Sequence, residues 1–122
     1  MEHHYKELFQ KYIRNGMSLV PDKAGGKGYA LKGLNIHADR IPTLPEAEGY
    51  ADSLQESNVA VMLGQVSGIV ALDLDTDEPE VMKVIEGLLP DSPVEKKGSK
   101  GFTRFFRYTG QQTEMLKYNG KV

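Results

Sequence analysis

The stretch IVALDLD, residues 69–75, is an apolar, largely β-branched run that ends in two alternate aspartates. An uninterrupted run of this kind predicts a strand that is covered on both faces of a sheet. Because side chains i and i+2 of a strand share a face, we expect Asp73 and Asp75 to project together, roughly 7 Å apart along the backbone. Two carboxylates this close repel each other unless a cation or hydrogen-bond donors compensate. The pattern predicts a divalent-metal site at the edge of a buried sheet, and a hydrogen-bonded strand-end carboxylate is the structural alternative for Asp73.

The composition around this stretch predicts one ordinary globular domain over residues 1–122. The chain is 39% hydrophobic and 26% charged, with a net charge of −2 and no cysteine. Its length suits a single core. The lack of cysteine excludes a disulfide framework and a thiolate metal site. No apolar stretch is long enough to span a bilayer and no signal-peptide pattern opens the chain, so we expect a cytoplasmic protein with no membrane partner.

Helical signals occur in three places. An apolar stripe at helical spacing begins after the first residues, and Thr43 with Glu46 fits a capping box in front of a second helix. Asp77 with Glu80 fits another capping box, with Pro79 early in the helix that follows. The first two helices are expected over residues 2–15 and 44–55. The buried stripe of the third would comprise Val81, Val84, Ile85 and Leu88.

Five short runs read as strands, over residues 17–20, 58–62, 69–75, 94–97 and 102–108. We expect Pro21 to end the first of them, and a long loop to fill residues 22–40. The short turn at residues 64–68 predicts that the second and third strands form an antiparallel hairpin. Helices and strands together predict an α/β (α+β) fold, a mixed sheet with flanking helices.

A basic turn follows the acidic strand. The segment KKGSKGFTRFFR, residues 96–107, carries five positive charges and no acidic residue, whereas residues 73–80 carry five acidic ones. Backbone N–H groups of a glycine-flanked turn can form an anion-binding concavity, to which Lys and Arg add charge. The turn is therefore a candidate triphosphate site, and an exposed hairpin with solvated lysines is the alternative. The candidate nucleotide-binding residues are Ser99, Lys100, Gly101, Thr103 and Arg104.

Other motifs that share the acidic segment fit less well. A calcium-binding EF-hand loop fails because Glu78 stands where its glycine belongs. The segment resembles the nucleophile motif of haloacid dehalogenase-like phosphatases only loosely, and no P-loop occurs. Two carboxylates suit hard cations such as Mg²⁺ or Mn²⁺, which serve in-line phosphoryl or nucleotidyl displacement. A complete site of that type usually has another carboxylate, and Glu78 is poorly placed because it lies past the strand.

Several pieces occur in an order that resembles a known family. GMSLVP (16–21), NVAVMLG (58–64) and SGIVALDLD (67–75) resemble the N-terminal domain of bifunctional DNA primase–polymerases. These enzymes belong to the archaeo-eukaryotic primase superfamily and are frequent in phages, prophages and plasmids. KKGSKGFTRFFRY (96–108) resembles the family's glycine-rich second motif. The similarity extends from about residue 8 to residue 108.

The resemblance implies a primase–polymerase-like fold that copies DNA by metal-dependent nucleotidyl transfer. Asp73 and Asp75 match the family's catalytic, metal-binding carboxylates, which implies Mg²⁺ or Mn²⁺ as cofactor. Nucleoside triphosphates and a single-stranded DNA template are the implied partners, with a C-terminal helicase domain or protein as a further candidate. Thr103 stands where the family usually carries a histidine, so Arg104 or Lys100 is expected to supply the positive charge.

The family's third acidic motif is not found before Val122. Residues 115–118 resemble a strand that leads into Asn119-Gly120, a strong hairpin signal with almost no chain after it. We therefore expect a truncated domain, or an end that pairs differently. The alternative function is a catalytically incomplete module that binds a nucleotide, single-stranded DNA or another protein. A metal-dependent phosphatase or nuclease is a third, weaker reading.

Overall fold

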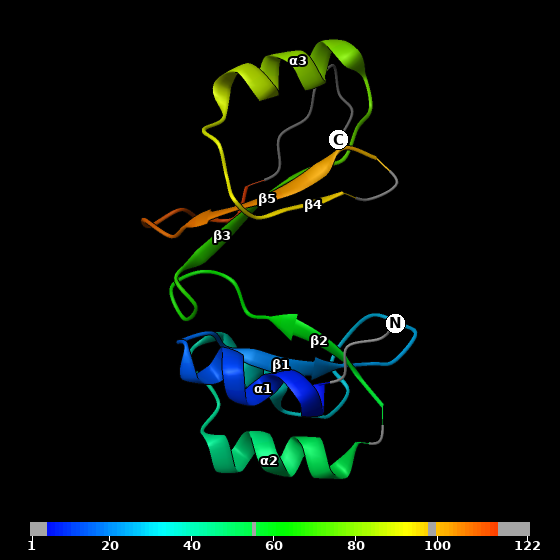
Figure 1. Ribbon diagram of the computed structural model, residues 1–122, viewed down its shortest axis with the longest axis vertical. Coiled ribbons are helices and arrows are strands. Elements are labelled where there is room, and N and C mark those ends of the chain that lie inside the picture. Colours follow the sequence, from blue (N-terminus) through cyan, green and yellow to red (C-terminus); the bar gives the residue numbers. More distant parts are fainter. Residues whose placement is uncertain (1–4, 55, 98–99, 115–122) are drawn as a thin grey trace. The chain divides into compact units, whose positions relative to one another are not determined.

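A computed structural model describes residues 5–54, 56–97 and 100–114 of the chain (Figure 1). The described residues form three α-helices, a 3₁₀ helix and two small antiparallel sheets, which confirms the mixed α and β composition. The expected strand over residues 115–118 and the turn after it lie outside the described residues. The chain divides into two compact units, residues 1–68 and 69–122, and each has its own sheet.

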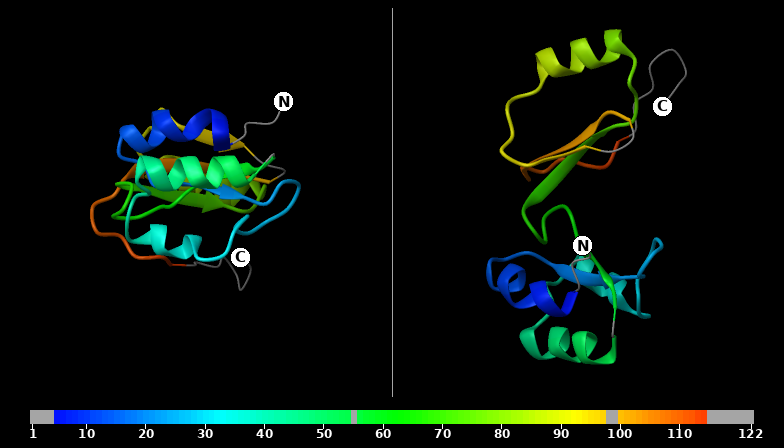
Figure 2. Two further views of the ribbon diagram at one scale, coloured as in Figure 1. Left: turned by 90° about the horizontal axis from the view of Figure 1, so that it is seen from below. Right: turned by 45° about the vertical axis from the view of Figure 1, so that its right-hand side comes forward.

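The core of the first unit lies between two helices and a strand. Helix α1 (Tyr5–Arg14) packs against helix α2 (Leu44–Ser53) and strand β1 (Leu19–Asp22), as Figure 2 also shows. Residues at i, i+4 and i+8 of α1 are buried, as the apolar stripe predicts. The buried hydrophobic cluster comprises Tyr5, Phe9, Ile13, Leu19, Ala47 and Ala51.

The capping box in front of α2 is confirmed. Thr43 Oγ1 accepts a hydrogen bond from the Glu46 N–H at 3.2 Å, and Glu46 Oε1 accepts one from the Thr43 N–H at 3.0 Å. The Arg40 guanidinium donates to both carboxylate oxygens of Glu46, at 2.6 and 2.9 Å. These hydrogen bonds hold the pKa of the Glu46 carboxyl well below its usual range, and the bonds from Arg40 have the largest effect. The helix ends at Ser53, two residues earlier than predicted.

Replacing Thr43 with alanine is expected to destabilise the chain by about 1 kcal/mol, because an N–H of the first helical turn loses its acceptor. Ser53→Ala at the other end of α2 is the matched control. The Ser53 hydroxyl is exposed and, among the described residues, bonds the Tyr50 carbonyl alone, so its loss should change stability by less than about 0.5 kcal/mol. Denaturant midpoints of the two variants measure the difference. Equal midpoints would contradict a stabilising role for the cap.

The first sheet pairs β1 with β2 (Asn58–Val61) in antiparallel register, with Pro21 opposite Val59. The prediction that Pro21 ends the strand is therefore wrong. Within this two-stranded sheet β1 is an edge strand, where the missing N–H of a proline is tolerated. The predicted long loop over residues 22–40 is also interrupted, by the 3₁₀ helix η1 (Leu34–Ala38).

The second sheet has the order β3-β5-β4, with all neighbours antiparallel. Its strands are β3 (Ile69–Leu74), β4 (Glu95–Lys97) and β5 (Phe102–Arg107), with β5 in the middle (Figure 1). The predicted hairpin of β2 with β3 is wrong, since β2 pairs with β1 and β3 with β5. The segment that connects β2 to β3 explains why they do not form a hairpin. Gly64 and Gly68 both have positive φ, and the Gly68 N–H donates to the Gly64 carbonyl, which forms a turn instead of a hairpin loop.

Two burial predictions for the second unit are also wrong. Strand β3 is half-buried, not covered on both faces, and Asp73 is its exposed member. Helix α3 (Pro79–Leu88) has no buried residue, and Val84 and Leu88 of the predicted stripe are 60% and 75% exposed. The three-stranded sheet is small, and α3 makes a charged contact with it, between Glu86 and Arg104 on β5.

The predicted cap of α3 is wrong as well. The N-cap residue is Glu78, without a side-chain hydrogen bond, and Pro79 is the first helical residue, as expected. The Asp77 carboxylate instead accepts a hydrogen bond from the Gly101 N–H at 2.8 Å, so a long-range donor has replaced the local one.

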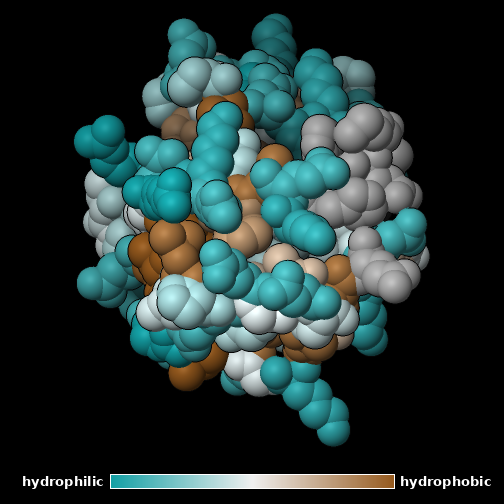
Figure 3. Space-filling model, turned by 60° about the horizontal axis from the view of Figure 1, so that its bottom comes forward, coloured by the Kyte–Doolittle hydropathy of each residue, from teal (hydrophilic) through white to brown (hydrophobic). Residues whose placement is uncertain are grey.

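The surface seen in Figure 3 is mostly hydrophilic, with hydrophobic side chains in small separate patches. Such patches are normal on a protein surface. None of the helices in the described part of the chain is long and apolar enough to cross a membrane.

Candidate metal and nucleotide site

Asp73 and Thr103 lie directly opposite each other on β3 and β5. The Thr103 hydroxyl donates to Asp73 Oδ1 at 2.8 Å, so the carboxylate is held in one orientation. Asp73 is exposed, and among the described residues Oδ2 has no hydrogen-bond partner. The structure thus joins one predicted metal ligand to one predicted nucleotide-binding residue, 30 positions later in the chain. The carboxylate is both oriented and accessible to a cation.

Asp75 follows one residue after the end of β3 and is exposed. It makes no ion pair with any described residue. Asp73 and Asp75 therefore remain the predicted carboxylate pair, at the end of one strand and open to solvent.

The basic turn is locked against the acidic segment by Gly101. Its φ is +55°, and a Cβ built on it would lie 1.8 Å from the Leu74 carbonyl oxygen and 3.0 Å from that of Thr76. Its N–H donates to the Asp77 carboxylate. Only glycine fits such a close backbone approach. The sequence predicted the basic turn, but Asp77, the residue that anchors it, was assigned to a helix cap and its contact with Gly101 was missed.

This anchoring changes the expected role of Gly101. Its N–H has Asp77 as a partner, so it is not available to a phosphate while that bond is intact. Lys100, next to it, is exposed and sits where the turn meets residues 74–76. Ser99 lies outside the described residues.

Arg104 is on the other face of the sheet. Side chains alternate along β5, so Arg104 points away from the face that carries Thr103. Its guanidinium donates to both oxygens of Glu86, at 3.0 and 3.1 Å, and lies 3.6 Å from Glu95. It also stacks over the Phe102 ring at 4.3 Å, and its side chain is 13% exposed. The hydrogen bonds with Glu86 raise the pKa of Arg104 further. The structure does not bring Arg104 to Asp73.

The donor set fits a metal only in part. Within residues 5–54, 56–97 and 100–114, no three His, Cys, Asp or Glu side chains gather as a metal cluster. Mg²⁺ is commonly held by one or two carboxylates, with water and substrate phosphates in the remaining positions. Asp73 and Asp75 supply the carboxylate oxygens that such an ion prefers. The residues fit an ion that is held jointly by the protein and a nucleotide.

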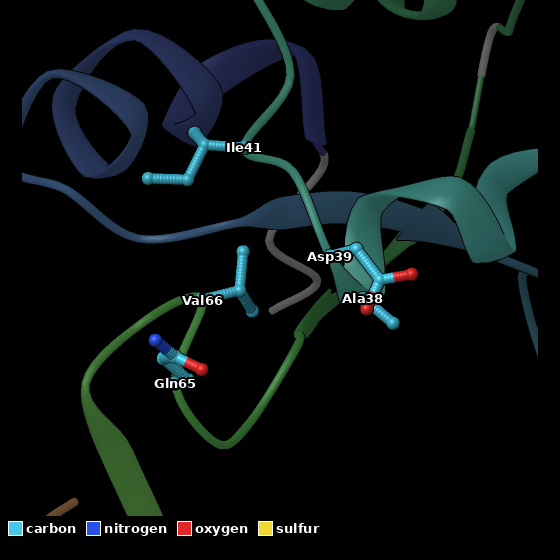
Figure 4. Close-up of a pocket in the computed structure, with 5 residues that line it drawn as sticks. All are labelled: Ala38, Asp39, Ile41, Gln65 and Val66. Carbon is cyan, nitrogen blue, oxygen red and sulfur yellow. The ribbon is translucent and has the colours of Figure 1, made fainter.

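The first unit also has a cavity and a buried histidine. A cavity of about 400 Å³ is lined by Ala38, Asp39, Ile41, Gln65 and Val66 (Figure 4), and it contains none of the predicted site residues. His37 is fully buried, and its ring nitrogens bond the Arg40 carbonyl and the Tyr50 hydroxyl, both at 2.8 Å. Both ring nitrogens have partners, which indicates a structural histidine.

The second unit thus has the features of a candidate metal and nucleotide site. Exposed carboxylates at the end of one strand are hydrogen-bonded to a neighbouring aromatic strand and to a basic, glycine-containing turn. The family model described as "Bifunctional DNA primase/polymerase, N-terminal" matches residues 9–121. The chain belongs to this family, which confirms the resemblance drawn from the sequence and connects the protein to DNA replication. No curated protein and no solved structure matches the chain.

Proposed function

We propose that the chain binds a nucleoside triphosphate together with Mg²⁺ or Mn²⁺, and that it serves nucleotidyl transfer onto a DNA-templated primer. Asp73 and Asp75 would hold the ion, and the template would be single-stranded DNA. One observation carries the proposal, the hydrogen bond that joins the Asp73 carboxylate to Thr103 across β3 and β5. Membership of the primase/polymerase family supports the same chemistry.

Three residues beside the ion would have different roles. Thr103 orients the Asp73 carboxylate. A hydroxyl has a single proton, so Thr103 does not also donate to a phosphate while it bonds Asp73. Lys100, in the turn that Gly101 locks beside residues 74–76, adds positive charge near the carboxylates. When bound, the ion would stabilise the attacking and leaving oxygens of an in-line displacement.

Calorimetric titration of the 122-residue chain with a nucleoside triphosphate, with and without Mn²⁺, tests the proposal. We expect binding that needs Mn²⁺ and that falls at least roughly tenfold in Asp73→Asn and in Asp75→Asn, because each loses a charged ligand. Asp91→Asn is the matched control, since Asp91 is an exposed carboxylate of the same unit in the loop between α3 and β4. Binding that is absent in the unmodified chain, or equal in all three variants, would contradict the proposal.

A second candidate function is nucleotide binding without catalysis. The observation that favours it is the missing third acidic ligand within the described part of the chain. Template-directed incorporation of a labelled nucleotide separates the two functions. Incorporation by the 122-residue chain favours the transferase, whereas Mn²⁺-dependent binding without incorporation favours the binding module.

A further inference from the structure

We infer that Lys96 contacts the triphosphate and supplies the positive charge that Thr103 does not carry. The inference rests on the proposed function and names a residue of the same site. Lys96 lies on β4, outside the set of residues that the sequence suggested for the nucleotide.

The strand register places Lys96 in line with the candidate site. On β5, Thr103 pairs with Asp73 of β3 on one side and with Lys96 of β4 on the other. Directly opposed residues of antiparallel strands point to the same face of the sheet. Asp73, Thr103 and Lys96 therefore form one row across all three strands, with the acidic end on β3 and the basic end on β4.

Arg104 and Lys97 lie on the opposite face, whereas Arg107 shares the face of Asp73 but pairs with Ile69 at the other end of β3. The guanidinium of Arg104 pairs with Glu86 and Glu95 on the opposite face. Lys97 is next to Lys96 in the same strand, so its side chain points to that opposite face, opposite Phe102. Of the two lysines of β4, only Lys96 therefore lies on the same face of the sheet as Asp73.

The spacing suits a metal-bound triphosphate. Adjacent strands lie roughly 4.8 Å apart, so Asp73 and Lys96 are about 10 Å apart at the backbone. An ion held at Asp73 would bring the phosphates over the middle strand, at Thr103. The exposed Lys96 ammonium, on its flexible stem, can reach them from the far side. Lysine binds phosphate in this way as a point charge.

Lys96→Ala and Lys97→Ala form a matched pair that tests the inference. They remove the same charge from neighbouring positions of one strand but from opposite faces. In the Mn²⁺ titration, Lys96→Ala should weaken triphosphate binding roughly 10- to 100-fold, the range for a hydrogen bond to a charged group. Lys97→Ala should change it less than about threefold. Lys96→Arg should recover part of the affinity, and a nucleoside monophosphate should show little difference between the two alanine variants.

The outcomes separate this inference from the proposed function. If Asp73→Asn abolishes triphosphate binding but Lys96→Ala and Lys97→Ala weaken it equally, the role of Lys96 is wrong and the proposed function stands. An unmodified chain that binds no triphosphate overturns both. Circular dichroism and thermal midpoints establish that the variants fold, and Lys96→Gln repeats the measurement with a longer neutral side chain.

Discussion

Gly101→Ala is expected to lower stability by roughly 2–5 kcal/mol and to abolish Mn²⁺-dependent nucleotide binding. Two costs add. An alanine at a φ of +55° costs about 1–2 kcal/mol, and its Cβ would lie 1.8 Å from the Leu74 carbonyl oxygen. Backbone atoms cannot rotate away as a side chain can, so relief requires the turn to move off β3, which breaks the Asp77 bond and displaces Lys100. Overpacking of this kind typically costs 1–3 kcal/mol more.

Gly110→Ala provides the control for backbone conformation. Gly110 also has a positive φ, +100°, but no atom of the described residues lies within 4 Å of its would-be Cβ. It should show the conformational cost of about 1–2 kcal/mol alone, with nucleotide binding retained. Chemical denaturation and the Mn²⁺ titration on both variants make the comparison. Similar losses of stability in the two would show that the turn does not pack closely on residues 74–76.

The features that the sequence predicted well depend on near neighbours. The Thr43–Glu46 capping box involves residues three apart, and the buried face of α1 follows from its own periodicity. The bounds of β2 and β5 came within one residue at each end for the same reason. Local propensity and capping act within one or two turns of chain, so a single sequence contains them.

The features that it missed depend on distant partners. Asp77 has the local signature of a helix cap, but the Gly101 N–H, 24 positions away, takes its carboxylate. The apparent β2–β3 hairpin failed because each strand found another partner. No local pattern records such pairings.

The assignment of Arg104 is a different case, because the sequence held the necessary signal. Thr103 and Arg104 are neighbours in a strand, so they cannot share a face. Once Thr103 is set opposite Asp73, Arg104 must lie on the other side, where the structure has it paired with Glu86.

Asp73→Asn is expected to weaken Mn²⁺-dependent triphosphate binding about 100-fold or more, and the combination of Asp73→Ala with Asp75→Ala should weaken it at least as much. Asparagine keeps the size of the side chain but not its negative charge, so the ion loses a charged ligand and no cavity forms. Thr103→Val should weaken binding roughly 10- to 100-fold, the usual effect of removing a hydrogen bond that orients a metal ligand. Calorimetry on the single and double variants measures both effects.

The double variant decides what the Thr103 hydroxyl does. If the hydroxyl acts through the Asp73 carboxylate, Thr103→Val has nothing left to disturb once Asp73 is Asn, and the double variant should bind no worse than Asp73→Asn. Thr109→Val, in the loop after β5, is the matched control and should leave binding unchanged. Additive losses would mean that the hydroxyl contacts the nucleotide by itself. If Thr103→Val lowers stability but leaves triphosphate affinity unchanged, the Asp73–Thr103 hydrogen bond serves only the pairing of β3 with β5.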